Sequence, residues 1–176
     1  MADRLRGNQV ILRRFRPDEF ETVWESRQDL DAPPGLFASK ERLRRLLERS
    51  GNLVDGRLDF AIEADGRLVG EIDARQPKDA LPPGVFELGL TLFRADDRGR
   101  GYGSEAVALL TDYLFSVLGA ERVQASTAVS NTAMRRVLEK LGFVEEGVMR
   151  SFMPGQSGRY DYALYGVTKE DWRART

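Results

Sequence analysis

The sequence predicts a mixed α/β fold: a central twisted sheet with helices on both faces, in one domain. Three observations predict it. The length of 176 residues is typical of a single domain with a sizeable core. Short apolar runs typical of strands alternate with segments of helical periodicity. No long linker, internal repeat or low-complexity segment divides the chain, so we expect a single domain over residues 1–176.

The first half of the chain predicts a strand, two helices and a hairpin. Branched apolar residues at 8–15 favour a strand. A proline opens the helical segment 17–28, and the sequence DAPPG then interrupts it. Ser39 is suited to cap a second helix over 40–51, whose many arginines we expect to form a solvated face. Two alternating runs within 57–75 meet at an Asp-Gly pair, which is typical of a tight hairpin turn.

The second half predicts strands that alternate with two helices. Residues 85–93 alternate in character and indicate a central strand. A glycine-rich stretch follows, then a helix that ends near residue 118 and a strand over 122–129. Asn131 is suited to cap a further helix, which Gly142 closes. Two late strands flank the sequence PGQSG.

The composition limits the chemistry and the partners. The net charge of −1 gives no general reason to expect binding to nucleic acid or to a membrane. The chain has no cysteine and no histidine, which excludes disulfides, thiolate nucleophiles, histidine-based dyads and the usual zinc ligands, so we expect no metal. The first residues lack an apolar core of signal-peptide length, and no segment is as apolar as a membrane span. We therefore expect a cytoplasmic protein.

The glycine-rich stretch RGRGYG, residues 98–103, indicates an anion site. The start of a helix offers unpaired amide groups and the positive end of the helix dipole, and glycines let an anion approach the backbone closely. A Walker loop would end in Gly-Lys-Ser/Thr, a dinucleotide fingerprint would space its glycines G-x-G-x-x-G, and a kinase would need a histidine. None of these three patterns fits.

The motif Arg98-x-x-Gly101-x-Gly103 resembles the Q/R-x-x-G-x-G/A motif of the GNAT superfamily of N-acetyltransferases. The segment ASTAVSNTAMRRVLEKLGFVEEGVMR and the closing G-x-x-D-Y-x-x-Y-G are similar to the RimJ/RimL-like branch, which acetylates the amino termini of ribosomal proteins. The resemblance covers residues 85–168 in detail. It implies a mixed, mostly antiparallel sheet that is splayed at its middle, with acetyl-coenzyme A as the co-substrate.

The resemblance also implies which residues bind the co-substrate. The loop amides and the start of the following helix would hold the pyrophosphate, and the preceding strand would hold the pantetheine and the acetyl oxygen. Coenzyme A carries phosphates that suit such amides and arginines. The expected contacts are Leu90, Thr91, Leu92, Arg98, Gly99, Arg100, Gly101, Tyr102, Gly103, Ser104, Asn131 and Arg136.

Glu87 is the candidate base. It lies on the strand that leads to the loop, where many relatives place a glutamate that deprotonates the amine directly or through water. Alternation places Glu87 on the face opposite Phe86 and Leu88. A solvent-facing strand residue with no catalytic role is the other interpretation. Because an α-amine has a pKa near ~8 and a lysine near ~10.4, a weak base favours an α-amine acceptor.

One position departs from the family pattern. Many relatives carry a tyrosine that protonates the leaving thiolate, and this chain has Leu138 there. Ser130 and Asn131 are the nearest catalytic replacements, although Asn131 also suits a helix cap. The expected function is acetyl transfer from acetyl-coenzyme A to a protein amino terminus or a small-molecule amine. A coenzyme-A-binding module without transferase activity is the alternative, and a homodimer is a further expectation.

Overall fold

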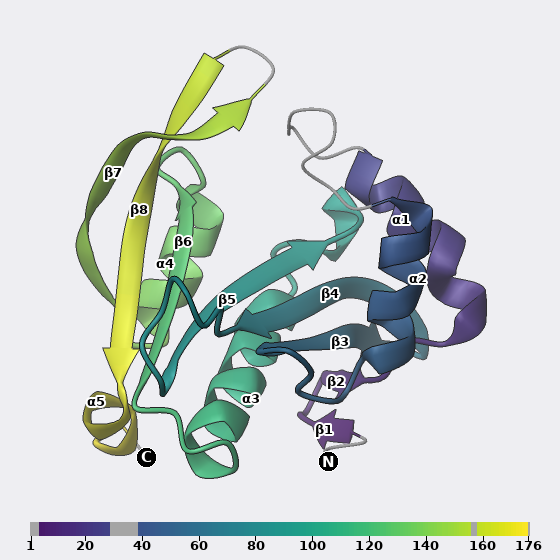
Figure 1. Ribbon diagram of the computed structural model, residues 1–176, viewed down its shortest axis with the longest axis horizontal. Coiled ribbons are helices and arrows are strands. Elements are labelled where there is room, and N and C mark those ends of the chain that lie inside the picture. The colour runs from purple at the N-terminus through teal and green to yellow at the C-terminus, as the bar shows by residue number, and fades with distance from the viewer. Residues whose placement is uncertain (1–3, 29–38, 156–157, 176) are drawn as a thin grey trace.

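The computed structural model describes residues 4–28, 39–155 and 158–175. Eight strands form one sheet in the order β1-β2-β3-β4-β5-β6-β8-β7 (Figure 1). All neighbouring pairs are antiparallel except β5 and β6, which are parallel. The strands are β1 (Arg4–Arg6), β2 (Val10–Arg13), β3 (Arg57–Ala64), β4 (Arg67–Arg75), β5 (Val85–Leu92), β6 (Arg122–Ala128), β7 (Val144–Gly155) and β8 (Gly158–Thr168).

Helices follow the predicted order. The α-helices are α1 (Phe20–Gln28), α2 (Lys40–Arg49), α3 (Tyr102–Ser116), α4 (Thr132–Lys140) and α5 (Lys169–Arg173), and the 3-10 turns are η1 (Pro17–Glu19) and η2 (Ala95–Asp97). The side chains of Ser39 and Asn131 cap α2 and α4 by accepting a hydrogen bond from a first-turn amide, as expected. The DAPPG break, residues 31–35, lies outside the described residues.

Several elements differ from the sequence prediction. The expected strand 8–15 is shorter, and β1 precedes it as a second arm of a small hairpin. The first helical turn after Pro17 is a 3-10 turn instead of α-helix. The short helix α5 was not predicted, although Thr168 and Asp171 form a capping box at its start. Elements of three to five residues give too little periodicity for a sequence pattern to detect.

Each face of the sheet has its own core. Phe60, Ile62 and Phe86 pack on the α3 side together with buried α3 residues such as Leu110 and Leu114. Ala61 points the other way and packs with α1 and α2. The period of two along β3 therefore sends alternate side chains to different helices. Figure 1 shows α3 beneath the centre of the sheet and α1 and α2 gathered over β3 and β4.

The parallel pair β5–β6 separates halfway along its length. Its register joins residues 85–88 of β5 to residues 122–125 of β6 and stops there. Beyond that point β5 pairs only with β4, and β6 pairs only with β8. Figure 1 shows the two strands diverging towards their C-terminal ends. The edge of residues 89–92 that faces β6 is consequently left without a ladder partner, and the sheet has the splay that the resemblance implies.

Candidate active site

The glycine-rich loop leaves a set of amide groups free at the start of α3. Gly101 is the N-cap of α3 and adopts a left-handed conformation with φ of 89°, which glycine tolerates far better than other residues. No side chain of the described residues caps this helix. The first amide of the helix region with a backbone partner is that of Glu105, which donates to the Gly101 carbonyl. The amides of residues 102–104 therefore remain available to an anion.

Buried contacts fix the loop against the β3–β4 hairpin. Asp97 is 1% exposed and accepts hydrogen bonds from Arg67, one of them at 3.0 Å. The Arg67 guanidinium holds the pKa of Asp97 below its usual value, so the carboxylate stays charged. The hydroxyl of Tyr102 donates to Asp65 at 2.7 Å. The ring of Tyr102 is thus a structural anchor, and only its amide is free for a ligand.

Gly103 has a packing role in addition to the one expected. A Cβ atom at this position would lie 3.1 Å from Cδ2 of Leu90, so the absence of a side chain lets α3 approach β5 closely. Arg98, Gly99 and Arg100 are exposed on the loop. Arg100 lies 3.5 Å from Asp65, an ion pair between two exposed side chains.

The free edge of β5 faces a large cleft. Leu90 and Leu92 pack towards the α3 core, and Thr91 lies on the other face of β5; Leu90 and Thr91 both line the cleft. The cleft has a volume of about 1210 Å³ and extends between α2 and the β7–β8 pair across the exposed face of the sheet. Its floor consists of residues from β3, β4, β5 and β6. The strand that is expected to bind the co-substrate, β5, and the expected base, Glu87, therefore line the same cleft.

Glu87 lies on the floor of this cleft. Its Oε1 accepts a hydrogen bond of 3.4 Å from the hydroxyl of Ser126 on β6 and lies 3.7 Å from a guanidinium nitrogen of Arg75 on β4. The side chain is 30% exposed, so it is open to the cleft without being free in solvent. The alternation argument correctly places Glu87 on the face opposite its apolar neighbours.

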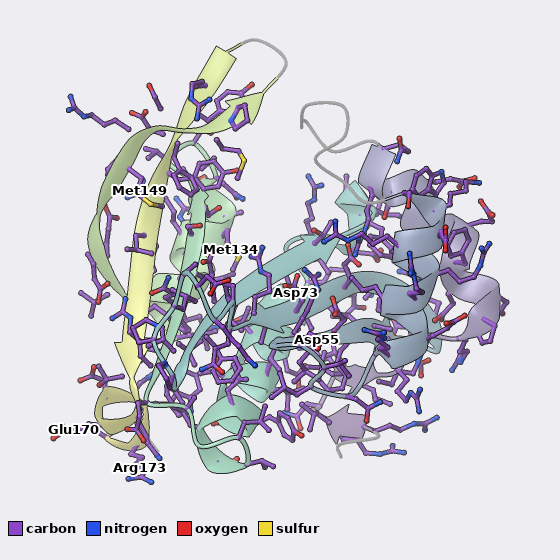
Figure 2. All side chains as sticks on the ribbon, in the orientation of Figure 1. Asp55, Asp73, Met134, Met149, Glu170 and Arg173 are labelled. Carbon is purple, nitrogen blue, oxygen red and sulfur yellow. The ribbon has the colours of Figure 1, made fainter. Side chains whose placement is uncertain are left out.

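A second carboxylate, Asp73, lies beside Glu87. Asp73 is paired in register with Gly89, whose missing Cβ would otherwise lie 2.7 Å from Asp73 Oδ1. The Nε of Arg75 is 3.0 Å from Asp73 Oδ2, but the direction is wrong for a hydrogen bond, and neither atom has a hydrogen-bond partner among the described residues. Figure 2 places Asp73 in the central part of the sheet.

Burial sets the charge of Asp73. Desolvation raises the pKa of Asp73 to about 6, and the nearby Arg57 and Arg75 offset only part of this effect. Asp59 and Glu71 add to the increase because they are like charges. Asp73, Arg75 and Ser126 were not identified from the sequence. Their signal is weak, because each has an ordinary position in an alternating strand.

The residues at the end of β6 take different positions. Asn131 lines the cleft, and its Oδ1 accepts from the amide of Met134 at 3.1 Å, so the predicted helix cap is present. Ser130 is exposed beside it. Leu138 is completely buried in the α3-side core. The position on α4 that carries a tyrosine in many relatives is thus a leucine that packs in the apolar core.

The two arginines of α4 differ in their availability. Arg135 donates to the Tyr165 hydroxyl at 3.0 Å and to Glu145 at 2.9 Å, so α4 is tied to the β7–β8 pair. Arg136 is exposed. Of the two side chains, Arg136 is the more exposed.

Comparison with known proteins identifies the family. The family model described as an acetyltransferase (GNAT) domain matches residues 9–144, which is more than half of the chain. The chain belongs to the GNAT acetyltransferase family. This GNAT chain is 24% identical over 173 residues to an uncharacterized SPbeta prophage-derived N-acetyltransferase, YokL, of Bacillus subtilis, with 94% of this chain and 93% of the relative covered.

Two solved acetyltransferase structures share the fold at 17% and 22% identity. The spermidine/spermine N-acetyltransferase SpeG of Vibrio cholerae superimposes with a TM-score of 0.80 at 17% identity, covering 96% of this chain and 99% of SpeG. RimJ of Mycobacterium smegmatis, solved in complex with CoA-disulfide, superimposes with a TM-score of 0.72 at 22% identity, covering 92% of this chain and 82% of RimJ. None of the helices in the described residues is long and apolar enough to span a membrane.

Proposed function

We propose that this GNAT enzyme transfers the acetyl group of acetyl-coenzyme A to a primary amine that enters the cleft above β5. One observation carries the proposal: residues 89–92 of β5 have one backbone edge without a strand partner, and a short loop connects them to free amides at the start of α3. A diphosphate and an extended amide-bearing chain are the ligands that such a surface fits. Acetyl-coenzyme A contains both and supplies the acetyl group.

The proposed co-substrate contacts combine backbone and side chains. The amides of residues 101–104 would bind the phosphates, and the exposed arginines Arg98, Arg100 and Arg136 would add charge-assisted hydrogen bonds. Leu90, Thr91 and Leu92 would use their free backbone edge, and Asn131 faces the same cleft. Gly99 contributes an exposed backbone position in the loop.

Glu87 is the proposed base. Glu87 would act by ordering a water molecule that receives the proton of the amine. Its hydrogen bond from Ser126 and its proximity to Arg75 hold the carboxylate at the cleft floor. Ser130, through its hydroxyl, and Asn131, through its side-chain NH2 group, are proposed to stabilise the departing thiolate by donating hydrogen bonds, because the family's tyrosine position is a buried leucine.

We also propose assignment to the RimJ/RimL-like branch, with an amino-terminal α-amine as the acceptor and a small-molecule amine as the second possibility. The motifs around Asn131 and in β8 support this branch. A homodimer and a cytoplasmic location complete the proposal. The dimer is supported by β7, an edge strand that exposes Val144, Val148 and Phe152.

The test measures binding and transfer separately. A hundredfold excess of acetyl-coenzyme A over its dissociation constant stabilises the native state by about 2.7 kcal/mol, which raises the Tm by about 5–10 °C for a chain of this size. NAD and ATP should leave the Tm unchanged. Release of the coenzyme A thiol in the presence of a panel of amines then measures acetyl transfer. Stabilisation without thiol release from any amine would favour the coenzyme-A-binding module, and an unchanged Tm would contradict the proposed co-substrate.

A further inference from the structure

One wall of the cleft is basic because of how α2 packs. Leu43 and Leu47 are buried against the sheet and α1. The opposite face of α2 presents Arg42, Arg45 and Arg49 to the cleft, at steps of three and four residues that keep them on one side of the helix. This face was expected to be merely solvated. In the folded protein it lies across the same cleft from Glu87.

The arginines of this wall form only weak interactions with other residues of the protein. The described ion pairs of α2 do not involve Arg42. Arg45 is 3.4 Å from Glu41, and Arg49 is 3.3 Å from Asp55, but more than half of each of these side chains is exposed. Exposed pairs of this kind contribute about 0–1 kcal/mol, so a ligand carboxylate can replace the partner.

Other arginines of the cleft are held in tighter ion pairs. Arg27 is bound to Glu71 at 2.8 Å, and Arg57 is bound to Asp59 at 2.7 Å. These shorter pairs are largely shielded from solvent and neutralise Arg27 of α1 and Arg57 of β3, while Arg75 of β4 lies between the carboxylates of Asp73 and Glu87. The available positive charge of the cleft is therefore concentrated on α2, while Glu87 keeps an acidic group beside the free edge of β5.

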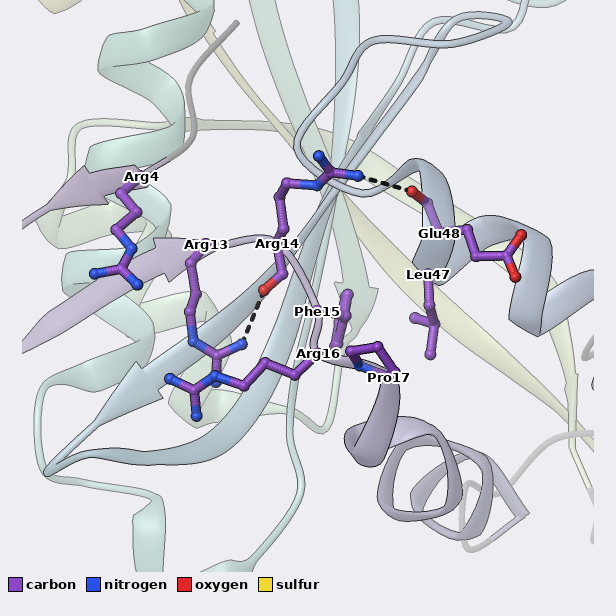
Figure 3. A pocket seen from close by; sticks show the side chains of 8 residues that line it. All are labelled: Arg4, Arg13, Arg14, Phe15, Arg16, Pro17, Leu47 and Glu48. Atoms are coloured by element: carbon purple, nitrogen blue, oxygen red, sulfur yellow. Dashed lines mark hydrogen bonds between the residues drawn. The ribbon is translucent and has the colours of Figure 1, made fainter.

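A second basic pocket lacks this property. It has a volume of about 500 Å³ and lies beside β1 and β2, with Arg13 and Arg14 among its lining residues (Figure 3). Arg13 is 3% exposed and bound to both Glu19 and Glu63. Arg14 donates to the Glu48 carbonyl, the dashed line at the upper centre of Figure 3. These two guanidinium groups hold the fold together, whereas those of α2 face an open cleft.

We propose that the acceptor is an amine that also carries a carboxylate or another anionic group, and that Arg42, Arg45 and Arg49 bind this group while the amine lies at Glu87. The inference rests on the proposed transferase function. A polyamine has only cationic groups and would meet the α2 wall with repulsion. An amino terminus followed by acidic residues and a small acidic amino acid both have the required chemistry.

The test compares acceptors that differ only in charge. Two peptides with the same free amino terminus carry either glutamates or glutamines at the following positions, and free glutamate and spermidine are added as small-molecule amines. Binding to the protein in the presence of coenzyme A is measured by calorimetry, and transfer by thiol release. We expect the acidic peptide to bind about tenfold more tightly than the glutamine peptide, and the difference to shrink as salt increases. Tighter binding of free glutamate than of spermidine would extend the proposal to small-molecule amines that carry an anionic group.

A matched pair of variants locates the effect. Arg42→Gln/Arg45→Gln should weaken binding of the acidic peptide about tenfold and leave the glutamine peptide unchanged. Arg44→Gln is the control, because Arg44 lies on the same helix but stacks over the ring of Phe20, 4.8 Å from its centroid. Circular dichroism confirms that all variants are folded.

The outcomes separate this inference from the proposed function. Equal binding of the two peptides, a preference for spermidine, or an equal loss in the Arg44→Gln control would overturn the acceptor proposal while transfer itself stands. Binding of the acidic peptide without transfer to any amine would support the α2 site and contradict the transferase function. Absence of both binding and transfer would contradict both.

Discussion

At the scale of single residues, two carboxylates share one arginine on the floor of the cleft. Arg75 lies 3.0 Å from Asp73 and 3.7 Å from Glu87. Asp73 is the more buried of the two, with a side chain that is 19% exposed. Glu87 is therefore the more open of the two to the cleft, and Asp73 is a partly buried carboxylate whose charge depends on pH.

Glu87→Gln should lower turnover by about 10²–10⁴-fold near neutral pH, the range typical of a lost general base. Affinity for coenzyme A should remain unchanged, because Glu87 faces the acceptor side of the cleft. The deficit should shrink at alkaline pH, where the amine is already deprotonated. The measurement is the pH profile of thiol release for parent and variant, and equal rates at neutral pH would exclude Glu87 as the base.

Asp73 should make the protein less stable as pH rises from about 4 to about 6. Burial raises the pKa of Asp73 from 3.8 to about 6, so in this interval the native state binds more protons than the unfolded state. The free energy of unfolding then falls with pH, by about 3 kcal/mol, and levels off above pH 6. Urea unfolding of the parent and Asp73→Asn across this range tests it. Parallel curves for the two proteins would show that Asp73 titrates normally.

At the scale of elements, two glycines at the start of α3 have different roles: Gly101 allows a left-handed backbone conformation, and Gly103 allows close packing. Gly101 has a positive φ and an open environment, in which a Cβ would meet one side-chain atom, Nε2 of Gln9, at 3.3 Å. Gly103 faces Leu90 instead. A substitution at Gly103 therefore combines a packing defect with any effect on the ligand, and Gly101 is the cleaner position for a test.

Gly101→Ala should weaken acetyl-coenzyme A binding at least about tenfold, because strain in the left-handed conformation moves the amides that face the phosphates. Gly119→Ala is the matched control: Gly119 has φ of 67° just beyond the other end of α3, with no atom within 4 Å of its Cβ position. Each variant should lose about 1 kcal/mol of stability. Calorimetry should find a binding defect in Gly101→Ala alone, and an equal defect in both variants would contradict the proposed phosphate site.

At the scale of the whole molecule, the sheet ends in an exposed edge. β7 lies at the end of the strand order, and three of the five large apolar side chains that are exposed in the described residues belong to it: Val144, Val148 and Phe152. Unpaired edges with apolar side chains favour association with a second chain. The β7 edge is therefore suited to a symmetric contact.

We expect light scattering at tens of micromolar to give the mass of a dimer. Val148→Lys should shift the protein towards the monomer, because it places a charge in the contact. Val117→Lys is the control, since Val117 is 61% exposed at the end of α3, away from β7. A monomeric parent, or the same shift in both variants, would exclude β7 as the interface.

The sequence alone was enough to predict the elements that rest on local chemistry. The caps at Ser39 and Asn131, the glycine loop before α3 and the face on which Glu87 lies all depend on residues within a few positions of one another. Helix capping, positive φ and strand alternation act over such short distances, which is why a pattern reveals them. Short elements such as β1 and α5 lacked a detectable period.

Only the tertiary structure decided which side chains meet. Asp73 reaches Gly89 through the register of β4 and β5, Ser126 reaches Glu87 from the neighbouring strand, and Arg42 faces the cleft because the leucines of α2 are buried on the other side. These partners are tens of residues apart in the chain, so no local pattern encodes their proximity. Burial then set the charge of Asp73, since desolvation depends on what surrounds a carboxylate and not on its neighbours in sequence.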